Sequence, residues 1–357
     1  MNKDKKKNAV RLAVIGCGHV AEYGHLPAIA ASDDWNCVAY VDVNRERAEL
    51  FAGKFGQGDV YTDYRAVLDR KDVDAVAVLT LPVGTHCQIA VDAMKAGKHV
   101  FTEKPISDSV KSGEKMVNAA KSSGKKLFVG FLLRHTEVYK KMAEVIHAGM
   151  IGSPILYRMI GFEHYRYETN SFLWKRALDF IRDTSPGFDC GSHYVDLMRW
   201  YSGAEAVAVQ GMGARINPDV PKGCFDWESF HIELSDGSRG IYETGWGFTF
   251  PANRLIKEAI GPKGRVFVRM AEIEEGKESG AEIVFQSIAN DDEKLLGKSG
   301  WKGFVEEWAH FARMIREDLD PYPALNDALA SVRIVEAAHY SALHGGKLIG
   351  LAGTVKQ

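Results

Sequence analysis

A glycine-rich turn near the start of the chain has the residue types and spacing that bind a dinucleotide. The run Gly16-Cys17-Gly18-His19-Val20-Ala21 follows an apolar stretch directly and opens a segment with a helical pattern. Glycine allows a tight turn and lets a pyrophosphate approach the backbone, and the small Ala21 lets the helix pack closely on the strand. The N–H groups at the helix start then face the phosphates. This GxGxxA fingerprint predicts a site for NAD or NADP.

An acidic residue follows at the distance that such sites use for the adenosine ribose. Asp42 stands 21 positions after Ala21, at the end of the second expected strand. A carboxylate there accepts hydrogen bonds from the ribose hydroxyls and repels a 2′-phosphate, which favours NAD over NADP. Arg45 would partly reverse that preference, so NADP stays open. The alternative interpretation is a plain glycine turn beside a surface aspartate.

Three residues further along have the chemistry to hold or move a proton. Lys104 is expected in a turn at the C-terminal end of a parallel strand, where open α/β sheets bind ligands. Asp189 and His193 are four positions apart, and in a helix they would share one face and converge on one hydroxyl. The alternatives are a solvated turn lysine, a helix N-cap for Asp189 and a histidine satisfied within its helix.

The elements that would position these residues alternate along the first part of the chain. Helix-like segments such as Arg45–Phe55 and Gln88–Ala96 lie between apolar runs. We expect a capping box, Thr85-x-x-Gln88, at the start of the second helix and Gly97 at its end. The runs have the length and continuity of strands buried on both faces: Val10–Ile15, Cys37–Val41, Ala75–Leu79, His99–Thr102 and Leu127–Phe131. The alternation predicts an α/β fold with a doubly wound parallel sheet of the Rossmann type.

After about residue 150 the pattern changes to that of an antiparallel sheet with helices. Alternating segments flank turn signals at Ser235–Ser238 and at Gly261–Gly264, and a last helix is expected over about Ala324–His344. We therefore divide the chain into a flexible N-terminus (1–9), an NAD(P)-binding Rossmann domain (10–135) and an α+β domain (136–357).

Composition narrows the classes of function. The length of 357 residues fits two domains of about 150 residues each. The formal net charge of −2 argues against nucleic acid or a membrane surface as a partner. Five scattered cysteines form no zinc pattern and indicate reduced thiols, and no segment has the pattern of a leader or a membrane span. We expect a cytoplasmic protein without a metal site.

Several motifs together carry a specific resemblance to a known family. They are the fingerprint, Leu79–His86, Ala96–Pro105 with its AGKHV and EKP runs, Gly130–Arg134, Gly149–Gly152, Asp189–Asp196, and Ala337–Ala342 with Gly345. The chain resembles the glucose–fructose oxidoreductase, inositol dehydrogenase and rhizopine-catabolism (Gfo/Idh/MocA) family over nearly its whole length, weakly between 210 and 300.

The resemblance implies an oxidoreductase whose C-terminal domain, residues 136–357, binds substrate and carries a large open, mostly antiparallel sheet. In the family that sheet often forms the oligomer interface, so a homodimer or homotetramer is expected. The implied reaction transfers a hydride between the nicotinamide and a hydroxyl-bearing carbon of a sugar, a polyol (inositol-like) or a sugar derivative. His193 would accept the proton in oxidation, Lys104 would stabilise the developing alkoxide, and Asp189 would orient the substrate or the other two groups.

The family also guides the expected contacts. Those with the cofactor are Gly16, Gly18, His19, Val20, Asp42, Arg45, Thr80, Leu81, Pro82, His86, Glu103 and Lys104. Those with the substrate are Lys104, Arg134, Tyr165, Trp174, Lys175, Arg176, Asp189 and His193. A mixed surface loop around Trp174 and a structural ion pair for Arg134 are the alternatives. The run Asp183–Phe188 departs from the family, which has glycines there, so the pocket wall is expected to differ.

Two other functions remain open at this point. A redox-neutral relative would oxidise a sugar transiently to cleave a glycoside or to epimerise it, and it would keep the same motifs. Product formation from a glycoside without bulk NADH would identify it. A non-catalytic regulator that senses the nucleotide is the third possibility, and the intact Lys104 and His193 argue against it.

Overall fold

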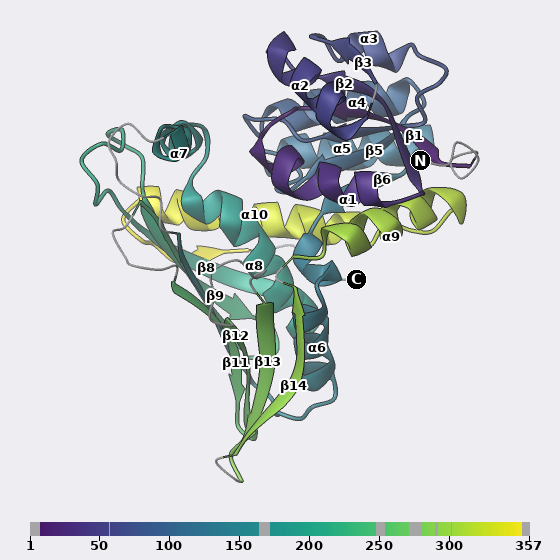
Figure 1. Cartoon of the computed structure of the whole chain (residues 1–357). Coiled ribbons are helices and arrows are strands. Elements are labelled where there is room, and N and C mark those ends of the chain that lie inside the picture. Colours follow the sequence, from purple (N-terminus) through teal and green to yellow (C-terminus); the bar gives the residue numbers. More distant parts are fainter. Residues whose placement is uncertain are drawn as a thin grey trace. The chain divides into compact units, whose positions relative to one another are not determined.

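The computed structural model describes residues 8–56, 58–163, 172–247, 254–270, 280–289, 292–300 and 302–351. Two compact units make up the chain (Figure 1), and each is described by itself. The first contains the described residues up to His135 together with Gly303–Leu329, and the second contains those of Thr136–Lys302 and from Ala330 onward. Residues 303–329, which the sequence-based division assigned to the C-terminal domain, therefore pack in the first unit. Of the expected flexible N-terminus, residues 1–7 lie outside the described residues.

The first unit is built on a six-stranded parallel sheet, in the order β3-β2-β1-β4-β5-β6. Its strands are β1 (Val10–Ile15), β2 (Trp35–Val41), β3 (Asp59–Tyr61), β4 (Ala75–Val78), β5 (His99–Glu103) and β6 (Leu127–Gly130). The four residues of β4 are fully buried, as expected for a strand covered on both faces. The Rossmann-type sheet is confirmed. The sequence did not predict β3, because a strand of three partly exposed residues has no clear apolar pattern.

Helices and helical turns connect these strands. They are the π-helical turn η1 (Ala21–His25), α1 (Leu26–Ala31), α2 (Arg45–Phe55), α3 (Arg65–Leu68), α4 (Thr85–Lys95), α5 (Val110–Ser123) and the 3-10 turn η2 (Leu132–His135). The helix α9 (Phe304–Arg316) returns to this unit from late in the sequence. Its buried Trp308 stacks on Phe101 of β5, with ring centroids 4.4 Å apart.

The expected capping box at α4 is wrong. The N-cap is Gly84, which makes no side-chain cap hydrogen bond. Thr85 lies one residue inside the helix and its hydroxyl donates to the carbonyl oxygen of Pro82 at 2.8 Å, while Gln88 donates to Asp92. The hydroxyl of Thr85, which a capping box would use for the helix N-terminus, is therefore bonded to the preceding loop. Gly97 does end the helix, with φ at +79°.

The described residues of the second unit form a nine-stranded sheet in the order β14-β13-β12-β11-β7-β10-β9-β8-β15, and among them only β7 and β10 pair in parallel. Its strands are β7 (Leu156–Glu163), β8 (Ala206–Ala214), β9 (Trp227–Leu234), β10 (Arg239–Trp246), β11 (Arg254–Gly261), β12 (Gly264–Met270), β13 (Gly280–Ser287), β14 (Glu293–Gly300) and β15 (Ile349–Gly350). The mostly antiparallel sheet and both expected hairpin turns are confirmed.

Helices cover one face of this sheet. They are α6 (Glu137–His147), α8 (Pro186–Ser202) and α10 (Leu325–Leu343), which begins in the first unit. A further helix, α7 (Phe172–Asp183), meets the end of β10, where Phe180 packs edge-on against Trp246. The helix α6 packs on β12, β13 and β14, and α8 packs on β9 and β10 (Figure 1). Close approach needs small residues: a Cβ on Gly211 of β8 would lie 1.9 Å from the carbonyl oxygen of Ala338 on α10.

The same substitution is expected to have opposite effects at two glycines. Gly211→Ala forces β8 away from α10, and we expect it to lower the free energy of unfolding by about 1–3 kcal/mol. Gly53 lies exposed within α2, and no atom lies within 4 Å of the position that a Cβ would take there. We expect Gly53→Ala to raise the free energy of unfolding by about 0.5–1 kcal/mol. Urea unfolding of both variants measures this, and a stable Gly211→Ala protein would contradict the packing.

Candidate functional site

The fingerprint loop lies between β1 and the first helix and leaves open space in front of its backbone. Gly16 has φ at +99°, and a Cβ there would lie 2.6 Å from the carbonyl oxygen of Leu79. Gly18 has no atom within 4 Å of the position that a Cβ would take. Gly16 therefore serves backbone packing and Gly18 keeps room at a helix N-terminus, where N–H groups bind an anion. This geometry fits a pyrophosphate.

Asp42 is buried directly after β2 and braces the fingerprint loop. One carboxyl oxygen accepts the N–H of Cys17 at 2.9 Å, and the other accepts the N–H of Asn44 at 2.8 Å. Each oxygen keeps a lone pair for a ribose hydroxyl. Arg45, the basic residue expected to modify the cofactor preference, pairs instead with Glu49 at 2.8 Å. The basic side chain beside Asp42 is that of Arg47, whose Nη1 lies 3.9 Å from the Asp42 carboxylate.

The loop after β4 supplies the next expected cofactor contacts, and His86 bridges it to the loop after β5. Leu81 and Pro82 are exposed and Thr80 is half-buried. The buried His86 has Nε2 2.9 Å from the carbonyl oxygen of Thr80 and Nδ1 3.1 Å from that of Pro105. Burial lowers the pKa of His86. A neutral imidazole carries one N–H, so His86 donates to one of these carbonyls at a time and acts as a structural link between the two loops.

Lys104 follows the last residue of β5 and is half-buried, while Glu103 before it is buried. The Glu103 carboxylate accepts the backbone N–H of Lys104 at 3.0 Å and lies 2.7 Å from Nε2 of His25. Burial alone would raise the pKa of Glu103, but the hydrogen bond from His25 helps to lower it on balance. Glu103 is thus an ionised group inside the first unit, and the sequence prediction that it contacts the cofactor gains no support from these bonds.

A second buried carboxyl, Glu307 of α9, lies near Glu103. Its side chain is fully buried, and neither of its oxygens has a hydrogen-bond partner among the described residues. Burial raises the pKa of Glu307 well above 4.5, and the negative charge of Glu103 adds to this. Of the two carboxyls, Glu103 therefore carries the charge and Glu307 the proton. No sequence motif signals either role, because both depend on the return of α9 to this unit.

In the second unit, Asp189 and His193 lie one turn apart in α8, as expected from their spacing. Both side chains are half-buried. The N-cap is Ser185, whose hydroxyl accepts the N–H of Phe188 at 3.0 Å, and Pro186 occupies the first turn. Asp189 is therefore not the N-cap of the helix. Ser185 and Pro186 of the run 183–188 therefore give α8 a strong start signal.

A buried carboxylate also anchors the start of α8. Glu228 of β9 is fully buried, accepts the N–H of Gly187 at 2.8 Å and lies 2.6 Å from Nδ1 of His339. A negative charge at a helix N-terminus is favourable, so Glu228 fixes the turn that leads to Asp189. Lys257 of β11 is buried nearby on the helix-covered face, with Nζ 3.7 Å from the ring centroid of Tyr194. Sequence reasoning missed both residues, because neither belongs to a motif.

The remaining expected substrate contacts divide into two sets. Arg134 is buried in the first unit, where Nη1 lies 3.5 Å from Asp327 and the guanidinium faces Tyr322. These contacts are those of the structural ion pair that was the alternative for Arg134. Trp174, Lys175 and Arg176 lie in α7. Tyr165 lies outside the described residues.

Metal sites and membrane-spanning helices are both absent from the described part of the chain. Its histidines, cysteines and carboxylates form no group arranged to hold a metal ion. No helix in the same residues has the length and apolar character needed to cross a membrane.

Comparisons with known families match both parts of the chain. A model described as the oxidoreductase family with an NAD-binding Rossmann fold matches residues 10–131. A model described as the GFO/IDH/MocA C-terminal domain matches residues 139–267.

Individual relatives match over most of their length. The scyllo-inositol 2-dehydrogenase (NAD(+)) of Bacillus subtilis is 28% identical over 350 residues, which is 95% of this chain and 96% of that protein. The myo-inositol 2-dehydrogenase of Thermotoga maritima is 28% identical over 72% of this chain and 75% of its own.

Solved structures share the architecture. An oxidoreductase from Thermotoga maritima is similar, with a TM-score of 0.81 at 25% identity over 96% of this chain and 98% of that one. A 3-ketoreductase from Actinomadura kijaniata, in complex with NADP and TDP-benzene, shares the fold with a TM-score of 0.78 at 22% identity over 94% and 98% of the two chains.

The unpaired Glu307 predicts a pH dependence of stability. The unfolded chain loses this proton above about pH 4.5 and the folded chain keeps it, so folding becomes less favourable as the pH rises, by up to about 1.4 kcal/mol per pH unit. Glu307→Gln keeps the shape without titrating. We expect it to stabilise the protein at pH 8 and to have little effect at pH 4.5, as measured by urea unfolding. An equal effect at both pH values would show that Glu307 is ionised in the folded protein.

Proposed function

The chain belongs to the family of glucose–fructose oxidoreductases, inositol dehydrogenases and rhizopine-catabolism proteins, and we propose that it oxidises a cyclic polyol or sugar at a secondary hydroxyl with NAD. It is an oxidoreductase that acts on CH–OH groups and carries an NAD-binding Rossmann domain. The observation that carries the proposal is the match to scyllo-inositol 2-dehydrogenase along nearly all of both chains. The retained Lys104, Asp189 and His193 supply the groups that such an oxidation needs.

The nicotinamide, when bound, supplies the hydride acceptor. The chain has to bind the dinucleotide, orient the hydroxyl and hold its proton. The loop at Gly18 receives the pyrophosphate, and Asp42 receives the ribose hydroxyls. Lys104 donates a hydrogen bond to the reacting oxygen and stabilises the charge that develops on it. His193 accepts the proton, because an imidazole is a suitable base near neutral pH, and Asp189 orients the hydroxyl or the two catalytic groups.

The surroundings of Asp42 support NAD as the preferred cofactor, with NADP as a weaker second. The carboxylate is buried and held at both oxygens, so it keeps its place and repels a 2′-phosphate. Arg47 beside it is about half exposed and is the group available to offset that repulsion. A panel of inositols, sugars, sugar acids and nucleotide sugars, run with NAD and with NADP, tests cofactor and substrate together by the absorbance of the reduced nicotinamide. Conversion of a glycoside without bulk NADH would favour the redox-neutral alternative.

Removal of either proposed acid–base group should lower turnover selectively. We expect Lys104→Ala and His193→Ala each to reduce kcat by about 10²–10⁴-fold, with the Kd for NAD nearly unchanged. Steady-state kinetics on the best substrate of the panel and NAD titrations measure the two quantities. His344→Ala is the matched control, because this ring lies exposed at the end of α10. Wild-type turnover in both catalytic variants would refute the assignment.

We also propose that the face of the large sheet opposite α6 and α8 binds a second copy of this chain. Alternating charges cross five strands of that face in a connected series. Arg158 pairs with Glu258, Arg265 with Glu258 and Glu293, Arg269 with Glu293 and Glu282, and Lys298 with Glu282. Both signs of charge occur side by side, so charges of one copy can face opposite charges of a second copy under a two-fold rotation.

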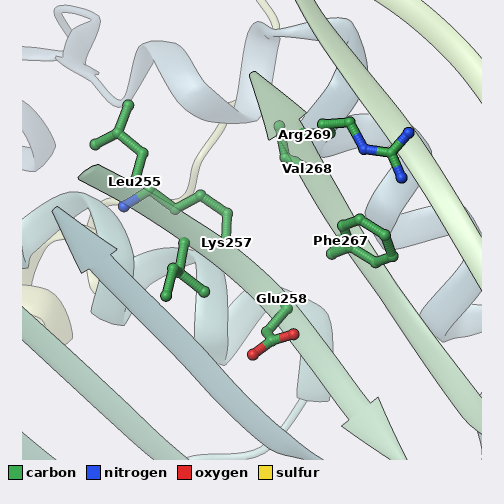
Figure 2. A pocket seen from close by; sticks show the side chains of 7 residues that line it. Leu255, Lys257, Glu258, Phe267, Val268 and Arg269 are labelled. Carbon is green, nitrogen blue, oxygen red and sulfur yellow. The ribbon is translucent and has the colours of Figure 1, made fainter. Parts of the chain in front are cut away.

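A hollow on this sheet adds to the argument. It lies at β11 and β12, and Figure 2 shows Glu258, Phe267 and Arg269 among the side chains that line it. The guanidinium groups of Arg265 and Arg269 both lie over the Phe267 ring, at 4.6 and 5.6 Å from its centroid. An aromatic ring flanked by arginines is a composition typical of protein interfaces.

A charge placed at the centre of this face should dissociate the oligomer. We expect Phe267→Glu to shift the protein toward monomers in sedimentation velocity at micromolar concentration, because an unpaired charge would be buried between the copies. Leu50→Glu is the matched control, since Leu50 is exposed on α2 in the first unit. A wild-type protein that sediments as a monomer would overturn the proposal.

A further inference from the structure

A chain of hydrogen bonds through the carboxylate of Glu103 joins three segments that are far apart in the sequence. The indole Nε1 of Trp308 on α9 donates to Nδ1 of His25 at 3.0 Å. Nε2 of His25 lies 2.7 Å from one carboxyl oxygen of Glu103, and the backbone N–H of Lys104 donates to the other at 3.0 Å. The chain of bonds therefore runs from α9 through η1 to the backbone of Lys104.

The direction of every bond in this chain is fixed by chemistry. An indole N–H only donates, so Nδ1 of His25 must be the acceptor and Nε2 must carry a proton. That N–H points at a carboxylate that already accepts the N–H of Lys104. Glu103 is thus an acceptor on both sides, which is the role of an ionised carboxylate and one that a neutral amide cannot fill at both atoms.

The surroundings hold the chain rigid. The side chain of His25 is fully buried, and its ring packs edge-on against Phe101, Phe304 and Trp308. The π-helical turn at Ala21–His25, a feature often found at functional sites, places His25 in this aromatic cage. A buried carboxylate with two charge-assisted or backbone donors keeps one position. The nearby Glu307 does not compete for these donors, since it has no partner among the described residues.

We propose that Glu103, held by His25 and Trp308, is a positioning residue that fixes the backbone of Lys104 and with it the direction of the lysine side chain toward the reacting oxygen. This inference rests on the proposed function, because it presumes that Lys104 acts on the substrate. In this proposal Glu103 acts by positioning Lys104, whereas the sequence predicted that it contacts the cofactor. His25 has no other function in the proposed reaction.

Glu103→Gln tests the requirement for two acceptors. The amide N–H₂ of the variant must face either the N–H of Lys104 or the N–H of His25, and His25 cannot exchange its protonated nitrogen while Trp308 donates to the other. We expect kcat to fall by about 10–100-fold with the Kd for NAD unchanged, because the lysine is displaced while the fingerprint loop and Asp42 stay in place. Glu307→Gln is the matched control, an equally buried glutamate outside the chain of bonds, and should leave both quantities unchanged.

Two variants at His25 provide a second test, which remains valid if the Glu103→Gln protein does not fold. His25→Leu removes the donor and should match the loss of kcat in Glu103→Gln. His25→Gln retains an N–H near the position of Nε2 and should recover most of it. Recovery by the conservative variant, measured on proteins with similar melting temperatures, is a result that a general packing defect does not give.

The outcomes separate this inference from the proposed function. If Lys104→Ala turns over at the wild-type rate, the proposed function fails. If Lys104→Ala is inactive while Glu103→Gln and His25→Leu keep wild-type kcat, the positioning role alone is overturned. Weaker NAD binding in Glu103→Gln at unchanged kcat would also overturn it, because that is the result expected of a cofactor ligand.

Discussion

The hydrogen bond between the buried carboxylate of Glu103 and His25 is the interaction on which the organisation of the first unit depends. A buried charge that loses its partner is strongly destabilising, so the elements that carry the two groups are obliged to stay together. Glu103 ends β5 and His25 lies in the helix after the fingerprint. Nδ1 of His25 in turn accepts a hydrogen bond from the indole N–H of Trp308 on α9. This bond explains why a helix from late in the sequence belongs to the first unit. The carboxylate that holds these elements together thus also binds the backbone N–H of Lys104.

The second unit uses the same physical solution at a different place. The buried carboxylate of Glu228 accepts the N–H of Gly187 and faces His339, so it joins β9, the start of α8 and α10. A Cβ on Gly187 would lie 2.6 Å from that carboxylate, which requires glycine at this point. In each unit, then, a carboxylate on a strand that lies beside a histidine accepts a backbone N–H. In the first unit it is the N–H of Lys104 itself, and in the second it is that of Gly187, two residues before Asp189.

The sequence predicted the parts of this molecule that local patterns determine. Continuous apolar runs indicated the parallel strands, and the spacing of Asp189 and His193 indicated a shared helix face. The failures occur where a side chain or a segment has a partner, near or far along the chain, that its motif does not show. The hydroxyl of Thr85 is used by the preceding loop, Arg45 pairs with Glu49 along its own helix, and residues 303–329 return to the first unit. His25, Glu228 and Glu307 belong to no local motif, because their roles arise only when segments far apart in the sequence pack together, as in the contacts of His25 with Glu103 and of Glu228 with His339.

The run 183–188 shows how the start of α8 is held in place. Ser185 and Pro186 begin α8 with a cap and a preset backbone angle, so the helix start does not rely on glycine flexibility. The one glycine of this run, Gly187, is the residue whose backbone meets Glu228. A rigid start fixes the rotation of the helix about its axis, and that rotation decides where Asp189 and His193 point. The start of α8 is therefore held by its own cap and by Glu228, and the proposed catalytic residues follow it within the helix.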